Sequence, residues 1–177
     1  MHSFLFSALA SFVLASGAAG PSDEMFEELR TAKSSVIAES LAEDISSALQ
    51  ESGSATADIL LERALVAEAI EDLDMAREFL DRAIAVEPEF SEAWFQRALI
   101  FLNEGKFDQA LYDLNEALTF EPRHFNAWLT LGALFEQLGE SKQALKAYQE
   151  VLKIHPHHST AQSQVRRLGP QVDGRSI

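Results

Sequence analysis

The chain has no cysteine among its 177 residues, and this absence excludes several kinds of chemistry. A disulfide framework, a thiolate zinc site and a cysteine nucleophile all need the missing side chain. No thiol is present that could carry a lipid anchor. At this length, a single domain can still bury most of its apolar surface without disulfides.

Basic residues are also scarce, since 14 Lys and Arg stand against 28 Asp and Glu, for a formal net charge of −14. Phosphate binding needs Lys and Arg, so we expect no nucleic-acid partner. The acidic residues crowd the first half: ten acidic and three basic residues give 57–90 a net charge of −7, whereas 125–158 holds three of each. This gradient is compatible with a basic partner segment, and equally with a solvated face that keeps the protein soluble.

Familiar catalytic patterns are missing as well. The sequence has no glycine-rich phosphate loop and no H-E-x-x-H zinc motif. His155, His157 and His158 could share a metal ion with His124, but they flank Pro156 without an acidic residue nearby in sequence. A solvated turn is the simpler interpretation. We therefore expect no enzyme activity, no cofactor and no metal, with zinc or copper at these histidines as the alternative.

The first 20 residues contain no Asp, Glu, Lys or Arg. An apolar run interrupted only by serines extends from Phe4 to Ala15, and small residues follow it. This order is typical of a secretory signal peptide, and Gly17 and Ala19 suit the sites before cleavage, although the usual leading Lys or Arg is missing. We predict a signal peptide over 1–19 and a periplasmic or secreted bacterial protein. An uncleaved anchor and an ordinary buried helix are the alternatives.

Three of the five prolines, Pro88, Pro122 and Pro156, are spaced 34 residues apart. A fixed period of this size is the signature of stacked repeats. Counting each proline as residue 32 divides the chain into units 57–90, 91–124 and 125–158. Small residues in each unit predict two helices that cross closely: Ala64 and Ala76, Ala98 and Ala110, Gly132 and Ala144.

The third unit carries the clearest motif, with W-x₂-L-G-x₂-F followed by A-x₃-Y and a proline. Its residues are Trp128, Leu131, Gly132, Phe135, Ala144, Tyr148 and Pro156. The second unit keeps Trp94 and Phe101 but has Arg97 in place of the leucine, and the first unit is the weakest. On these residues the chain resembles the tetratricopeptide repeat (TPR) family over 57–158. The resemblance implies an all-α fold, a right-handed α-solenoid of three TPR helix pairs with helical caps at both ends.

The turn inside each unit follows the first helix. Gly105 and Gly139 occupy the same place in the second and third units, where a left-handed residue ends a helix most easily as glycine. Glu71 stands there in the first unit, so the turn in that unit departs from the pattern.

The segments outside the units read as caps. Residues 20–56 hold two short amphipathic stretches, with Ser22 as a candidate N-cap, and we predict that they cover the open end of the first unit. Residues 159–168 are predicted to form a C-terminal capping helix that Gly169 and Pro170 end. The last residues, 169–177, are predicted to be a loose tail.

The TPR resemblance also implies where a partner would bind. In such folds the first helix of each pair lines the concave side, and the second, fifth, ninth and twelfth residues of each unit tend to face it. These positions are Asp58, Leu61, Leu65 and Glu68 in the first unit, and Ala133 with others in the third. The partner-binding residues that we predict, the groove set, are Glu92, Phe95, Leu99, Leu102, Asn126, Leu129 and Glu136.

An apolar floor with acidic edges suits a helix or an extended peptide with large apolar anchors. Packing of Leu65, Leu99 and Leu129 against neighbouring repeats is equally compatible, and Phe95 and Leu102 are the two side chains expected to be exposed. Chaperone-tail binding resembles a clamp of Lys, Arg and Asn around terminal carboxylates. The matching positions here are apolar or acidic, so we expect no binding of acidic C-termini.

The order of apolar leader, acidic helix and repeats is similar to small exported TPR proteins of alphaproteobacteria, a group defined by sequence rather than by activity. We expect an exported protein–protein interaction module or scaffold that binds a peptide or helix of a partner. We expect no stable membrane insertion once the signal is removed. The alternative is a self-assembling structural protein of the cell envelope, a homo-oligomer whose groove is filled by the same chain or a second copy.

Overall fold

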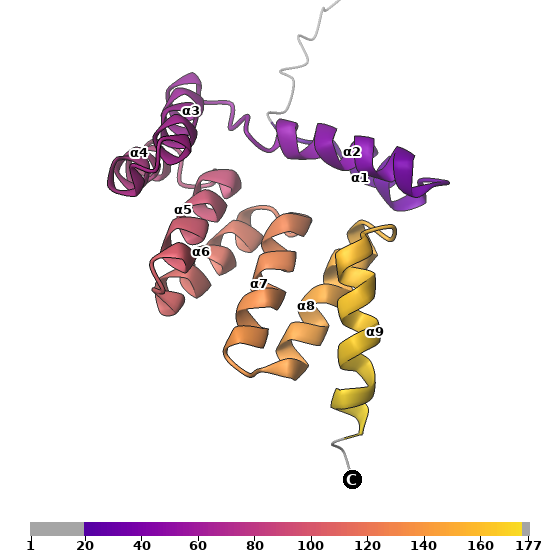
Figure 1. Cartoon of the computed structure of the whole chain (residues 1–177). Helices are drawn as coiled ribbons and strands as arrows, with labels where there is room; N and C mark the ends of the chain where they lie inside the picture. Colours follow the sequence, from indigo (N-terminus) through magenta and orange to yellow (C-terminus); the bar gives the residue numbers. More distant parts are fainter. Residues whose placement is uncertain (1–19, 175–177) are drawn as a thin grey trace, which may run out of the picture.

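A computed structural model describes residues 20–174, and these fold into nine α-helices joined by short turns (Figure 1). The helices are α1 (Asp23–Thr31), α2 (Ser35–Ala48), α3 (Ala55–Ala69), α4 (Leu73–Val86), α5 (Ser91–Asn103), α6 (Phe107–Phe120), α7 (Phe125–Gln137), α8 (Ser141–Ile154) and α9 (Ser159–Asp173). The predicted signal peptide, 1–19, lies outside the described residues. Between residues 20 and 174, no helix is both long and apolar enough to cross a membrane.

Six of the helices form three pairs, α3/α4, α5/α6 and α7/α8, one for each predicted unit. The second helix of each pair packs on the first helix of the next, which confirms the predicted solenoid of TPR helix pairs. The small residues at the crossings are buried: Ala64, Ala76, Ala98, Ala110 and Ala144 are at most 2% exposed. A larger side chain at these places would push the helix axes apart.

The carbonyl oxygen of each repeat proline, near the end of its unit, accepts a hydrogen bond from a side chain. Trp94 Nε1 donates to the Pro88 oxygen at 2.8 Å, and Trp128 Nε1 donates to the Pro122 oxygen at 2.9 Å. After the third unit, Gln162 Nε2 takes the same role toward Pro156 at 2.7 Å. The donor is always six residues after the proline, so this contact recurs with the 34-residue period.

The turn inside each pair has the same left-handed backbone in all three units. Gly105 and Gly139 have φ of 71° and 79°, and Glu71 adopts φ 62° in the first unit. A side chain in this region costs about 1–2 kcal/mol relative to glycine. The first pair therefore keeps the family turn at a cost, because the packing of α3 on α4 imposes it.

The C-terminal helix α9 packs on α8 through Leu168 and Val165 and covers the last pair, as predicted. It does not stop at Gly169 and Pro170 but continues to Asp173, so the predicted end at residue 168 is wrong. Val172 packs into the same cluster as Leu168, and this burial holds one more helical turn after the proline.

Helices α1 and α2, with the turn between them, form an N-terminal hairpin that does not cap the first pair. Its buried side chains, among them Phe26, Leu29 and Ile45, pack instead with Phe125 of α7, Val151 of α8 and Ala161 of α9. In Figure 1 the hairpin lies across the ends of α7 and α9, away from α3 and α4. The predicted cap over the first unit is thus wrong in its placement.

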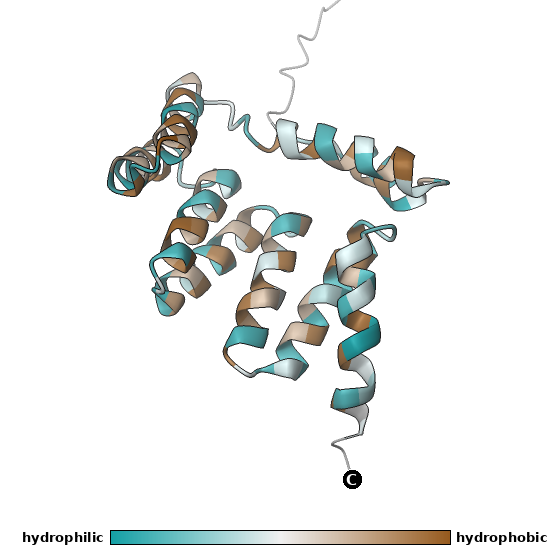
Figure 2. Cartoon of the chain, in the orientation of Figure 1, coloured by the Kyte–Doolittle hydropathy of each residue, from teal (hydrophilic) through white to brown (hydrophobic). Residues whose placement is uncertain are grey.

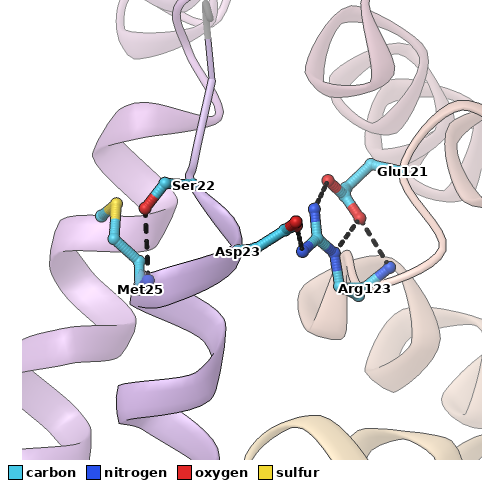
Figure 3. A network of polar contacts seen from close by, with 5 residues as sticks. All are labelled: Ser22, Asp23, Met25, Glu121 and Arg123. Atoms are coloured by element: carbon cyan, nitrogen blue, oxygen red, sulfur yellow. Dashed lines mark hydrogen bonds and ion pairs between the residues drawn. The ribbon is translucent and has the colours of Figure 1, made fainter.

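Polar contacts fasten the N-terminal hairpin to the turns between pairs. The guanidinium of Arg123, in the turn before α7, bonds Asp23 at 2.6 Å and Glu121 at 2.9 Å, and it lies 4.1 Å from the ring centre of Phe26 (Figure 3). Ser22 caps α1 as predicted, because its Oγ accepts from the Met25 amide.

Two further contacts continue the attachment along the edge of the solenoid. Asn126 Nδ2 donates to Ser46 Oγ at 3.3 Å, and His157 Nε2 lies 2.9 Å from the carbonyl oxygen of Ala32. The linker to α3 turns the chain back, since Asp58 Oδ1 accepts from both the amide and the hydroxyl of Ser52. The hairpin therefore belongs to the third pair in space and to the first pair only in sequence.

Gly132 tests the close crossing of α7 and α8, because a Cβ at this residue would lie 2.6 Å from Tyr148 Cε1. Tyr148 is 2% exposed and packs in the cluster with Ala144, Leu145 and Leu168, so moving its ring would disturb buried neighbours. Gly132→Ala is expected to lower the free energy of unfolding by about 1–3 kcal/mol despite the better helix propensity of alanine, as chemical denaturation would measure. The second pair has Ala98 and Leu114 at these positions, so adding Tyr148→Leu should lose less than the sum of both single changes. A stabilising Gly132→Ala would contradict the packing.

Arg123 tests the attachment of the N-terminal hairpin. Arg123→Ala should weaken the docking of α1 by about 1 kcal/mol, from the lost contact over Phe26 and an exposed ion pair. Hydrogen exchange of the α1 amides should become faster, while that of α5 and α6 stays unchanged. Arg30→Ala is the matched control, because Arg30 pairs with Glu27 of its own helix. Equal acceleration in both variants would argue against the docking role.

Candidate functional site

The groove set divides between α5 and α7, the first helices of the second and third pairs. Two of its members are not available to a partner, since Glu92 is 5% and Phe95 is 7% exposed. The expectation that Phe95 is exposed is therefore wrong. Both side chains turn instead toward His124, the residue that caps α7.

Glu92, Phe95 and His124 form a buried contact between the second and third pairs. The Ala127 amide donates to His124 Nδ1 at 3.3 Å, which leaves Nε2 as the protonated nitrogen. Nε2 then donates to Glu92 Oε2 at 3.0 Å, and the ring lies 4.7 Å from that of Phe95, centre to centre. Gln96 supplies a second donor to the Glu92 carboxylate at 2.6 Å. This cluster fixes how α7 follows α5, so its role is structural.

Three members of the groove set on α7 contact other parts of the chain. Asn126 bonds the N-terminal hairpin through Ser46, and Leu129 packs against the clusters under the hairpin and under α9. Glu136 accepts from the Tyr148 hydroxyl at 2.8 Å and forms an ion pair with Arg167 of α9. The hairpin and α9 thus occupy both ends of the groove set on the third pair.

Leu99 and Leu102 are the two remaining members of the groove set, and Leu65 and Ala133 hold the same repeat position as Leu99. Leu99 and Leu102 are half-buried on α5, where they pack on the core of the second pair. Ala133 is exposed on α7, and Leu65 is half-buried on α3. These four residues, the open floor, are all apolar. The acidic edge predicted at Glu136 is neutralised by Arg167, and the apolar middle of the groove stays a prediction.

A buried ion pair in the second pair was not predicted. Arg97, which stands where the family motif has leucine, bonds Asp113 through two nitrogens at 2.8 Å and Asp81 of α4 at 2.7 Å. Asp113 is 1% exposed, and this burial raises the pKa of its carboxyl while Arg97 opposes the shift. Leu131 and Ala147 hold the positions of Arg97 and Asp113 in the third pair. The second pair thus has a basic and an acidic residue where the third pair has two apolar ones, and this could have predicted the ion pair from the sequence.

The histidine cluster lines a small cavity of about 250 Å³ between the turn before α9 and the start of α2. His157 contacts the Ala32 carbonyl, and His158 Nδ1 accepts from the Ala161 amide at 3.3 Å as the cap of α9. His155 is buried and its Nδ1 has no partner among the described residues. Within residues 20–174, no three acidic or histidine side chains converge as metal ligands.

The histidine cluster should make the fold sensitive to acid. Burial, helped by the charges of His158 and His157, lowers the pKa of His155 from 6.5 to about 4. The folded state therefore holds His155 neutral, and its contribution to stability is complete above pH 6.5 and is lost as the pH falls toward 4. By pH 5 this loss should reach about 2 kcal/mol in denaturation experiments, and His155→Leu should remove it. An identical pH dependence of stability in the variant would contradict this assignment.

Two family models described as tetratricopeptide repeat match the chain, at residues 61–120 and 101–168. A TPR repeat-containing protein of the alphaproteobacterium Rhizobium etli is 34% identical over 85 residues, which cover 48% of this chain. The match covers 42% of that relative, so the chain spans less than half of its length.

Solved structures agree on the fold. The TPR domain of Arabidopsis OM64 superposes with a TM-score of 0.61 at 24% identity, over 66% of this chain and 96% of that domain. The first TPR domain of Spaghetti (RPAP3), bound to the HSP90 peptide SRMEEVD, superposes with a TM-score of 0.62 at 22% identity, over 67% and 96%. At this identity the likeness shows the fold alone. With the family models spanning 61–168 and three helix pairs in the predicted register, the chain belongs to the tetratricopeptide repeat family.

Proposed function

We propose that this protein is a non-catalytic interaction module that binds a segment of another protein on the open floor, Leu65, Leu99, Leu102 and Ala133. The observation that carries this proposal is the exposure of Ala133 at the repeat position that half-buried Leu65 and Leu99 hold in the other two units. An apolar strip of this kind receives the anchors of an amphipathic helix or an extended peptide. Binding of a peptide by a similar TPR domain supports the same kind of use.

The partner segment is apolar and neutral or basic. The first helices of the three pairs carry two basic residues between them, Arg63 and Arg97, and neither belongs to the groove set. Arg97 is already paired with Asp81 and Asp113. No cation is therefore available on the floor for an acidic peptide such as SRMEEVD, and long-range repulsion from the acidic first pair adds to this selectivity.

The N-terminal hairpin limits where the segment lies. It occupies the start of α7 through Asn126, while α9 holds Glu136 near the end of the same helix. The segment therefore crosses the middle of α7 at Ala133 and continues onto α5 at Leu99 and Leu102. A footprint of this size suits a short peptide with two or three anchors rather than a long helix along the whole solenoid.

Peptides selected from a display library against the full chain would test the open floor. Ala133→Glu adds a charged side chain at an exposed place, so it should weaken the selected peptides about tenfold or more without unfolding the protein. Ala85→Glu, at an exposed alanine of α4 outside the floor, is the matched control and should leave affinity unchanged. The peptide SRMEEVD should not bind. Selected peptides that bind Ala133→Glu as tightly as the wild type would disprove the floor as the site.

We also propose that the chain is exported from a bacterial cell with 1–19 as its signal peptide. The support is the uncharged apolar run with small residues before Gly20. N-terminal sequencing of the protein recovered from its native host should begin after Ala19. A mature protein that retains Met1 would contradict the cleaved signal.

A further inference from the structure

The first helix pair has an apolar face that no other part of the described chain covers. Ile59 and Val66 of α3 are 49% and 60% exposed, Ile70 directly after α3 is 68% exposed, and Met75 of α4 is 44% exposed. With Phe79 they form the first-pair face, which lines a recess of about 370 Å³. Figure 2 shows hydrophobic residues along α3 and α4 at this free end of the solenoid.

The later pairs show what normally covers such a face. Ile59 and Val66 are the third and tenth residues of their unit, and the matching residues are Ala93 and Ile100, then Ala127 and Leu134. All four of those residues are at most 1% exposed. They are buried because the second helix of the preceding pair packs on them, α4 in one case and α6 in the other. The first-pair face is thus a docking surface for one helix of this type.

Charge gives a second, independent indication of the same helix. Arg97, the seventh residue of its unit, pairs with Asp81 of the preceding helix α4 at 2.7 Å. Arg63 stands 34 residues earlier, at the same position and on the rim of the recess. Neither Arg63 nor Arg82 forms an ion pair within residues 20–174. A helix that packed on α3 in the way that α4 packs on α5 would place a carboxylate opposite Arg63.

We propose that the first-pair face binds an amphipathic helix of another protein, docked as α4 docks on α5. Aliphatic side chains of that helix pack on Ile59 and Val66, and an acidic side chain one turn away pairs with Arg63. A symmetric dimer through this face is disfavoured, because two first units (57–90) of net charge −7 would have to meet. This surface lies on the outer end of the first pair and is separate from the open floor.

Because the proposed partner helix docks as α4 does, a peptide with the sequence of α4 can serve as a probe for this surface. A blocked synthetic peptide of residues 73–87 carries the apolar stripe and the Asp81 carboxylate of α4. Fluorescence anisotropy at physiological salt should show saturable one-to-one binding of this peptide to the full chain. Val66→Asp should weaken it about tenfold or more, because the new carboxylate would be buried on apolar surface. Leu138→Asp is the matched control at an exposed leucine, at the repeat position of Ile70, and should have no effect.

A charge exchange tests the predicted register. Arg63→Glu should weaken the peptide several-fold, and a peptide with Asp81→Arg should restore binding to that variant and bind the wild type poorly. Ala133→Glu should bind the peptide normally, so failure of the open floor and failure of this face are distinguishable. Absence of saturable binding, or equal binding by Val66→Asp, would overturn the proposal. A concentration-dependent dimer in sedimentation that Val66→Asp abolishes would also overturn it, in favour of a second copy.

Discussion

Stacking is the constraint on which this structure depends, because a single helix pair leaves an apolar face that only a neighbouring pair can bury. The face at Ala93 and Ile100 is buried by α4, and the face at Ala127 and Leu134 is buried by α6. The close crossings within each pair and the hydrogen bonds to Pro88 and Pro122 hold the successive pairs at the angle that this burial needs. A change at one junction therefore affects the position of every later pair.

The N-terminal hairpin alters how that constraint is met at the free end. Because its apolar residues pack on α7, α8 and α9, it closes the far side of the solenoid and leaves α3 and α4 open. The same placement covers the start of α7, where a partner in the groove would otherwise reach Asn126. The packing of the N-terminal hairpin on α7, α8 and α9 thus shortens the predicted groove and leaves the first-pair face exposed. The exposed apolar residues at Ile59, Val66 and Ile70 are a consequence of that placement.

The fold and its register could be predicted because they follow from local, periodic features. The 34-residue spacing, the small residues at the crossings and the capping Ser22 each act within one unit or one helix turn. The partner-binding surface was harder to predict from the sequence, because the exposure of a side chain at a groove position depends on neighbours that are distant in sequence. Phe95 occupies a groove position in the sequence, but the ring of His124 packs against it. Glu136 does the same, but Arg167 of α9 forms an ion pair with it. The continuation of α9 past Pro170 likewise depends on the burial of Val172.

The sequence by itself determined three TPR helix pairs, the positions of their turns, and a strongly acidic first half, since periodicity and composition are properties of the chain alone. Only the tertiary structure decided which pair the N-terminal hairpin covers, which groove residues remain open, and which end of the solenoid keeps an apolar face exposed. The physical reason is that the amphipathic pattern of a helix predicts that its apolar face is buried, but does not identify the surface that buries it. Which surface covers it is settled by the competition among all the apolar faces of the folded chain.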